Sequence, residues 1–182
     1  MKPPWRPFWR RSRRASDSMN IRRVAPTDGE VLLDIWLRSV RATHSFVSEA
    51  DIQSIMPLVR QYLTSSGPEI WVLSSDAGEA MGFMGMSGNK MESLFLAPEF
   101  HRQGGGRRLV RHAQQLYGEL TADVNEQNEA ARRFYESCGF LVEGRSPVDE
   151  QGRPYPLLHM RLALPPQESL TRSAAAPDTS TG

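Results

Sequence analysis

The spacing of apolar residues changes several times along the chain, and each change predicts a secondary-structure element. Short, nearly continuous apolar runs alternate with segments whose apolar residues recur every three or four positions, the pattern of a helix with one buried face. In the first half, strands are expected at 19–25, 70–73, 81–86 and 91–96, and helices around 27–36 and 52–63. Because these strands are almost continuously apolar, helices should cover both faces of their sheet.

The second half of the chain continues this alternation after a run of three glycines. The glycines are expected to open a helix whose apolar stripe extends from Leu109 to Leu120. The remaining elements are expected as a strand at 121–124, a helix at 128–137 and two strands around the turn at 149–154. The order β-αα-βββ-α-β-α-ββ predicts an α/β fold, in which about four helices flank a mixed central sheet of about seven strands.

Two helix ends have specific local signals. Thr27 and Glu30 match a capping box, in which each side chain accepts a backbone N–H of the other residue, and they predict the start of the first helix. Gly139 follows Cys138 and precedes the apolar Phe140, which predicts that the last helix ends with a glycine in the left-handed conformation.

Length and composition fit one compact domain. The chain has 182 residues, of which 39% are hydrophobic, and we expect a single domain at 19–164. Residues 1–18 are basic and lack the apolar stretch of a signal peptide, so they are expected to be a disordered leader. Residues 165–182, rich in Pro, Ser, Thr and Ala, are expected to be a disordered tail. No apolar run approaches the ~20 residues of a membrane span.

Charge and cysteine content exclude several classes of function. The net charge is +1, but residues 1–18 contribute +5, so the remainder is −4 and nucleic-acid binding is not expected. Cys138 is the single cysteine of the sequence, which excludes an internal disulfide and favours a reducing, cytoplasmic location. The four histidines have no metal-ligand spacing, so no metal is expected.

The glycine run at Gly104, Gly105 and Gly106 is the most informative local feature. It follows an apolar strand and opens a helix, so its backbone N–H groups can converge on an anion such as a phosphate. A dinucleotide-binding fingerprint would need glycine where Leu109 stands, and a P-loop would need Gly-Lys-Ser or Gly-Lys-Thr. Both of these phosphate sites are therefore disfavoured.

Two segments resemble conserved motifs of the GNAT superfamily of N-acetyltransferases. Residues 94–109 are similar to its motif A, although His101 stands where arginine or glutamine is usual, and residues 125–140 are similar to its motif B. The resemblance implies the GNAT fold, with the sheet splayed between the motif A strand and the strand after it. It also implies that the glycine turn holds the pyrophosphate of acetyl-CoA as co-substrate.

Two further segments narrow the resemblance. Residues 38–46 and 144–158 look like a group of small bacterial peptidyl-lysine N-acetyltransferases within that superfamily. The acceptor so implied is a primary amine, here a protein lysine that attacks the thioester directly. Acetylation of a small amine, such as a polyamine or an aminoglycoside, and acetyl-CoA sensing without turnover stay open as alternatives. The protein is expected to be a monomer or a homodimer.

The resemblance and the local chemistry together give a set of cofactor-binding residues. Leu94 and Leu96 would act through their backbone groups, which an extended pantetheine arm can pair with like a strand. Asn128 could cap the last helix or contact that arm. The full set is Leu94, Phe95, Leu96, His101, Arg102, Gln103, Gly104, Gly105, Gly106, Arg107, Asn125, Asn128 and Tyr135.

Tyr135 is the candidate general acid. A phenol with a pKa of ~10 can protonate a departing thiolate, and Phe134 beside it is expected to enter the core while Tyr135 faces the sheet opening. The catalytic base is open between Glu92, expected on the same strand face as Leu94 and Leu96, His44 in the acceptor region, and no dedicated base at all. Together with His44, Tyr155 is expected at the acceptor site.

Overall fold

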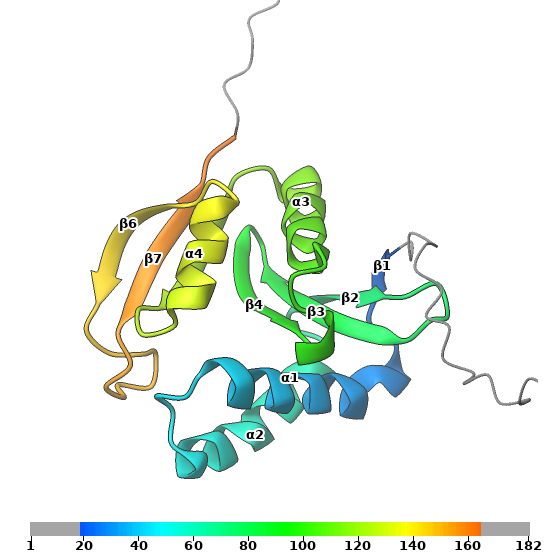
Figure 1. Cartoon of the computed structure of the whole chain (residues 1–182), viewed down its shortest axis with the longest axis horizontal. Coiled ribbons are helices and arrows are strands. Elements are labelled where there is room, and N and C mark those ends of the chain that lie inside the picture. Colours follow the sequence, from blue (N-terminus) through cyan, green and yellow to red (C-terminus); the bar gives the residue numbers. More distant parts are fainter. Residues whose placement is uncertain (1–18, 165–182) are drawn as a thin grey trace, which may run out of the picture.

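A computed structural model describes residues 19–164, which form one seven-stranded sheet with two pairs of helices. Helices α1 (Gly29–Thr43) and α2 (Glu49–Thr64) lie on one side of the sheet, and α3 (Gly105–Tyr117) lies on the other with α4 (Glu129–Ser137) (Figure 1). The expectations for 1–18 and 165–182 concern residues outside the described part of the chain. Within 19–164, no helix is long and apolar enough to cross a membrane.

The order of elements expected from the sequence is confirmed. The strands are β1 (Asn20–Arg23), β2 (Glu69–Ser74), β3 (Ala80–Ser87), β4 (Lys90–Leu96), β5 (Leu120–Asn125), β6 (Leu141–Ser146) and β7 (Leu157–Leu162). Short 3₁₀ turns at Pro26–Asp28 and Pro98–Phe100 precede α1 and α3. Helix α3 is shorter than the expected apolar stripe, because Gly118, at φ 77°, ends the helix and Leu120 belongs to β5.

The sheet is mixed, and its one parallel pair is short. The strand order is β1-β2-β3-β4-β5-β7-β6, and neighbours are antiparallel except β4 and β5. The parallel pair consists of Lys90 opposite Thr121 and Met91 opposite Ala122. Since β4 continues to Leu96 and β5 to Asn125, the two strands separate beyond this point. The expected splay is therefore confirmed.

A β-bulge lies at Glu92, just where the splay begins. On the β3 side, Met86 is opposite Met91 and the next residue, Gly85, is opposite Ser93, which leaves Glu92 as the extra residue of β4. The bulge shifts the alternation of side chains. Glu92 therefore does not share the face of Leu94 and Leu96, and the expectation that it does is wrong.

Two apolar clusters pack on opposite faces of the sheet. Strand β2 supplies both, because Ile70 and Val72 point toward α1 and α2 while Leu73 points toward α3 and α4. Leu32, Ile35 and Phe83 are buried in the first cluster, and Leu109, Leu120 and Phe140 in the second. The sheet is thus covered by helices on both faces, as its continuous apolar runs predict.

The two helix ends turn out differently from each other. Gly139 ends α4 as predicted: its φ is 98°, its N–H donates to Glu136 O (2.9 Å) and the Phe140 N–H donates to Tyr135 O (3.1 Å). The capping box of Thr27 and Glu30 does not form. Pro26 starts a 3₁₀ turn instead, and the buried Asp28 accepts the Ala25 N–H at 2.7 Å.

Asp28 also binds Arg22, and this pair gives a prediction about stability. The Asp28 carboxylate accepts two hydrogen bonds from the Arg22 guanidinium, at 2.6 and 3.0 Å, and these bonds lower the pKa of Asp28. We expect Asp28→Ala to lower the free energy of unfolding by about 2 kcal/mol at pH 7. Its effect should shrink below about pH 4, because the contribution of Asp28 is lost as the pH falls through its lowered pKa.

Urea unfolding at pH 7 and pH 3 measures both effects. Thr27→Ala is the matched control, because the exposed Thr27 is the residue that the sequence pattern wrongly assigns to the cap. It should change stability by no more than about 0.5 kcal/mol. Equal losses for the two variants would contradict this account of the start of α1.

Candidate functional site

A cleft of about 820 Å³ lies where β4 and β5 have separated, between the end of α1, the second half of β4 and the helices α3 and α4. The described residues that line it are Ser39, Thr43, His44, Leu94, Phe95, Leu96, His101, Arg102, Gly104, Gly105, Gly106, Arg107, Asn128, Ala130, Ala131, Arg133, Phe134, Tyr135 and Ser137. Of the predicted cofactor-binding residues, all but Gln103 and Asn125 are in this set.

The free edge of β4 forms one wall of the cleft. The Ala97 N–H donates to Met81 O of β3 at 2.9 Å. Backbone groups alternate in direction along a strand, so those of Leu94 and Leu96 point away from β3 and toward the splay. The Leu96 carbonyl fits this direction, because it meets His101 Nε2 at 3.0 Å on that side. An extended ligand can therefore pair with β4 as a missing strand would.

The start of α3 supplies a second set of free backbone groups. Its first intrahelical bond joins the Arg108 N–H to Gly104 O (3.1 Å), so the N–H groups of Gly105, Gly106 and Arg107 have no acceptor within the helix. Gly104 adopts a φ of 86°, a conformation that glycine tolerates best. Convergent N–H groups and the positive helix end favour an anionic ligand here.

Two glycines let α3 begin close to its neighbours. A Cβ on Gly105 would lie 2.6 Å from Leu73 Cδ2 in the core, and a Cβ on Gly106 would lie 3.0 Å from Phe134 Cζ on α4. Larger residues would push the helix away from β2 or from α4. The glycine run thus serves packing as well as access to the backbone.

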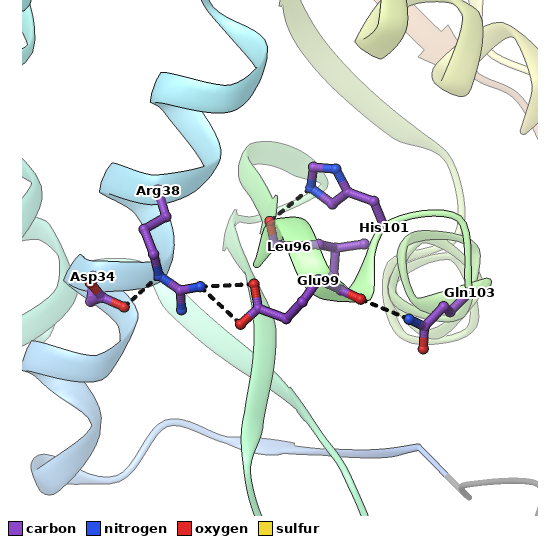
Figure 2. Close-up of polar contacts among 6 residues, drawn as sticks. All are labelled: Asp34, Arg38, Leu96, Glu99, His101 and Gln103. Carbon is purple, nitrogen blue, oxygen red and sulfur yellow. Dashed lines mark hydrogen bonds and ion pairs between the residues drawn. The ribbon is translucent and has the colours of Figure 1, made fainter. Parts of the chain in front are cut away.

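Polar contacts hold the turn between β4 and α3 against α1 (Figure 2). The Arg38 guanidinium donates to both oxygens of Glu99 at 2.8 Å and to Asp34 at 2.7 Å. Gln103 donates its side-chain amide to Glu99 O at 2.8 Å, which directs it away from the cleft. His101 binds back to Leu96 O, so this histidine fastens the turn to the strand that precedes it.

The charge of the cleft is positive. Among its described lining residues are three arginines, Arg102, Arg107 and Arg133, and no aspartate or glutamate. Arg107 also joins α3 to α4, because its guanidinium donates to the backbone oxygen and the hydroxyl of Ser137, both at 3.0 Å. A cationic cleft beside free backbone N–H groups suits a ligand with several phosphates.

Tyr135 reaches the cleft from α4 and is buried, with 8% of its surface exposed. Its hydroxyl donates to Met91 Sδ at 3.5 Å, a weak acceptor that another group can replace. Burial raises the pKa of Tyr135, so the phenol keeps its proton. Tyr135 therefore faces the opening as expected, whereas Phe134 is only half-buried and also lines the cleft, so the expectation that Phe134 enters the core is wrong.

His44 lies at the end of α1 and packs against two aromatic rings. Its ring centroid is 5.4 Å from that of Phe46 and 6.5 Å from that of Phe95. Its Nδ1 is 2.8 Å from Thr43 Oγ1 and its Nε2 is 3.4 Å from Asn128 Nδ2. Burial lowers the pKa of His44 from 6.5 to about 4, because the charged imidazolium loses its hydration. The ring is therefore neutral at pH 7.

Asn128 combines the two roles weighed from the sequence. Its Oδ1 accepts the Ala131 N–H at 3.0 Å and caps α4, while its side chain is 7% exposed and lines the cleft. Asn125 has a local role, since its Oδ1 accepts the Gln127 N–H at 2.9 Å. Within the described residues, Asn128 is thus the asparagine that faces the cleft.

A second cavity of about 330 Å³ opens on the α1 and α2 side of the sheet, beside α2. Its lining is mostly apolar and consists of Trp36, Ile55, Leu58, Val59, Tyr62, Phe83, Glu92, Ser93, Phe95, Gln151 and Arg153. Phe95 lines both cavities. Strand β4 therefore borders both the basic cleft, at its free edge, and the apolar cavity.

Glu92 is the carboxylate in the lining of this second cavity. It lies 3.5 Å from Lys90 Nζ, which also contacts Asp123 at 3.0 Å and Glu150 at 3.1 Å. Three carboxylates thus surround one lysine. Within the lining, Glu92 and Arg153 carry opposite charges, and the excess negative charge lies in the cluster around Lys90 beside the cavity. This cluster favours a cationic molecule near Glu92.

Tyr155 lies outside the described lining of both cavities. Its hydroxyl donates to Asp51 Oδ2 at 2.5 Å, and its ring packs near Phe46 at 6.2 Å. The hydrogen bond to Asp51 raises the pKa of Tyr155. Tyr155 therefore joins the segment before β7 to the start of α2.

Several lining residues carry no signal that sequence reasoning could use. Thr43 precedes His44 in an ordinary helical segment, and Ser39 is one more small residue of α1. Trp36 and Tyr62 match the apolar periodicity of a core, and they also line the second cavity. Such residues acquire a role only through the tertiary arrangement.

No three His, Cys, Asp or Glu side chains within 19–164 are grouped so that they could hold a metal ion.

Comparison with known sequences gives one family. The sequence model of the Acetyltransferase (GNAT) family matches residues 33–140. The chain is also 46% identical over 142 residues to the peptidyl-lysine N-acetyltransferase YjaB of Salmonella typhimurium (strain LT2), and the alignment covers 78% of this chain and 97% of that protein.

Comparison with solved structures agrees. The solution structure of apo-form YjaB from Escherichia coli matches with a TM-score of 0.75 and 44% identity, over 79% of this chain and 97% of that one. A PaiA N-acetyltransferase from Thermoplasma acidophilum, solved in complex with coenzyme A, matches with a TM-score of 0.63 over 79% and 98% of the two chains. Its identity is 22%, so this second likeness concerns the fold alone.

The surroundings of His44 predict an unusual titration. In an NMR pH titration, the ring of His44 should titrate near pH 4 in the folded protein and near 6.5 in urea. The unfolded chain binds the proton more readily, so the folded state should lose up to about 3 kcal/mol as the pH falls from about 6.5 to about 4. His44→Gln, which does not titrate, should lack this loss. A folded-state pKa near 6.5 would contradict the burial described above.

Proposed function

The chain belongs to the GNAT acetyltransferase family, and on that premise we propose that it transfers the acetyl group of acetyl-CoA to the side-chain amine of a lysine in a protein or peptide. One observation is central to this proposal. A basic cleft at the free edge of β4 and an apolar cavity on the α1 and α2 side of the sheet both reach this strand and share Phe95. A donor in one cavity and an acceptor in the other would meet at this strand.

The basic cleft fits coenzyme A. Its N–H groups at Gly105, Gly106 and Arg107 suit a pyrophosphate, and the arginines around it suit a molecule with several phosphates. The free backbone edge at Leu94 and Leu96 suits the extended, amide-containing pantetheine arm. These groups therefore bind the two ends of one long ligand. Acetyl-CoA would supply a thioester, from which the acetyl group passes directly to the amine as the thiol leaves.

Backbone N–H groups of β4 would stabilise negative charge during the transfer. The N–H groups of Leu94 and Leu96 face the splay and have no strand partner on that side. In a site from which water is largely excluded, such a fixed donor acts strongly on a developing oxyanion. The splay of β4 from β5 thus gives the strand a catalytic role in addition to a binding one.

Tyr135 would hold the proton that the leaving sulfur needs. The hydroxyl is buried, keeps its proton because burial raises the pKa of Tyr135, and donates to a weak acceptor, Met91 Sδ. Replacing one sulfur partner by another costs this hydroxyl little. Tyr135 is accordingly assigned as the general acid.

The second cavity would receive the acceptor lysine. Its aromatic and aliphatic walls suit the four-carbon stem of lysine, and the charge of Glu92 attracts the ammonium group. Glu92 is therefore assigned to bind the acceptor ammonium and, through water, to accept the proton that it must lose before the amine attacks the thioester. His44 lies in the basic cleft instead, with its Nε2 directed at Asn128, and is not assigned as the base.

An acceptor panel tests the proposed function and separates it from its rivals. Acetyl-CoA is incubated with N-terminally blocked lysine peptides, with spermidine and with an aminoglycoside, and CoA release is followed together with the mass of each acceptor. We expect acetylation of the peptides at lysine, as the name of the YjaB relative suggests, and none after Lys→Arg in the same peptide. Acetylation of the small amines alone would contradict the proposal, and acetyl-CoA binding without any transfer would indicate a sensor.

A second prediction concerns Tyr135→Phe, which keeps the ring and removes only the proton donor. Turnover should fall by about 10²–10⁴-fold, while the Kd for acetyl-CoA stays unchanged. The defect should be smaller for a thioester whose leaving thiol is more acidic. Tyr117→Phe is the matched control, because Tyr117 is bonded to Trp71 and Glu69, far along α3 from its start. Wild-type turnover in Tyr135→Phe would exclude Tyr135 as the acid.

A further inference from the structure

A continuous chain of hydrogen bonds connects α1 to α4 along the wall of the cleft. Thr43 Oγ1 donates to Ser39 O at 2.8 Å and lies 2.8 Å from His44 Nδ1. His44 Nε2 lies 3.4 Å from Asn128 Nδ2, and Asn128 Oδ1 accepts the Ala131 N–H at 3.0 Å. This series of hydrogen bonds therefore begins at the backbone carbonyl of Ser39 and ends at the backbone N–H of Ala131.

The hydrogen bonds of Thr43 determine which ring nitrogen of His44 carries the proton. A hydroxyl has one hydrogen, and Thr43 donates it to Ser39 O. Toward His44, Thr43 Oγ1 can then act only as an acceptor, so Nδ1 must carry the ring proton. In the neutral ring this leaves Nε2 with its lone pair, directed at Asn128.

The second end decides the orientation of the Asn128 amide. Its oxygen accepts the N–H of Ala131, which turns the nitrogen toward His44. One N–H of that nitrogen donates to Nε2, and the other has no acceptor among the described residues. Because Asn128 lines the cleft, this second N–H is available to a ligand there.

We propose that Thr43 and His44 are positioning residues, which together hold the Asn128 amide so that its second N–H donates to a carbonyl oxygen of the acetyl-CoA arm. Thr43 sets the tautomer of His44, and His44 Nε2 then accepts from Asn128 and prevents the amide from rotating. The identity of the ligand rests on the proposed function, whereas the hydrogen-bond chain rests on the protein alone.

The surroundings of the chain support this role. The rings of Phe46 and Phe95 pack against the partly buried His44 and limit the access of water to its nitrogens. The opposite tautomer would direct Nε2–H at the Asn128 N–H groups and leave Nδ1 facing an oxygen that has no hydrogen to give. That arrangement would lose two hydrogen bonds at once in a buried place, which is costly.

The tautomer can be measured directly in the ligand-free protein. Long-range ¹H–¹⁵N NMR spectra of protein labelled in histidine distinguish a protonated from an unprotonated ring nitrogen. We expect His44 Nδ1 to be protonated and Nε2 unprotonated at pH 7. A proton on Nε2 in the wild type would overturn the proposal.

Thr43→Val and Thr43→Ser form the matched pair of variants. Valine keeps the shape and removes the hydroxyl, so the Nδ1–H population should fall and the Kd for acetyl-CoA, measured by calorimetry, should rise roughly three- to ten-fold. Serine restores the hydroxyl and should restore both readouts. The KM for the amine should not change in either variant, since neither touches the second cavity.

His44 itself offers a second pair. His44→Gln places an amide oxygen near the position of Nε2 and should retain most of the acetyl-CoA affinity, whereas His44→Asn is too short to reach Asn128 and should lose it to the same extent as Thr43→Val. A wild-type protein that binds no acetyl-CoA would refute the proposed function. A wild-type protein that binds it no better than Thr43→Val would refute only the positioning role.

Discussion

A strand that leaves its neighbour exposes a row of backbone donors and acceptors, and these groups need new partners. In this protein β4 leaves β5 after Met91, and five further residues of β4 extend along the opening. The site depends on this separation. It leaves the backbone groups of Leu94 and the N–H of Leu96 free, it makes room for the cleft, and it makes β4 a wall shared by the cleft and the second cavity.

Several features keep the opening from closing. The bulge at Glu92 changes the course of β4 where the separation begins. Helix α4 packs against β5 on the far side of the opening, and Arg107 of α3 joins the two helices. The chain from Thr43 to Asn128 joins α4 to α1 on the other side. The helices around the opening are therefore joined to one another by side-chain contacts that do not involve β5.

Much of the fold could be predicted because its signals are local. Apolar periodicity predicts the helices and the first five strands, the turn at 149–154 predicts the last two strands, and the glycines at 104–106 and 139 predict where helices begin and end. Apart from Gln103, the candidate cofactor residues of the β4–α3 segment gather in one cleft for the same reason: a contiguous strand, turn and helix place them together. The role of Asn128 could also be predicted, because a capping asparagine is recognisable from its position before a helix.

The parts of the fold and the site that could not be predicted depend on tertiary contacts for which the sequence has no local signal. One extra residue in β4 turns Glu92 to the other face, and period-two reasoning cannot foresee a bulge. Arg22 and the Ala25 N–H both donate to Asp28, and the capping box expected at Thr27 does not form. Thr43 meets Asn128 only through a histidine and across 85 positions of sequence. In each case a tertiary partner overrides or creates the local role.

Amide hydrogen exchange at the edge of β4 tests the central claim most directly. In the free protein, the N–H groups of Leu94 and Leu96 should exchange much faster than that of Ala97, which is bonded to Met81 O. Addition of coenzyme A should slow Leu94 and Leu96, together with Gly105 and Gly106 at the start of α3. Slow exchange of Leu94 and Leu96 in the free protein, with no change when coenzyme A is added, would contradict the claim that the splayed strand is the binding edge.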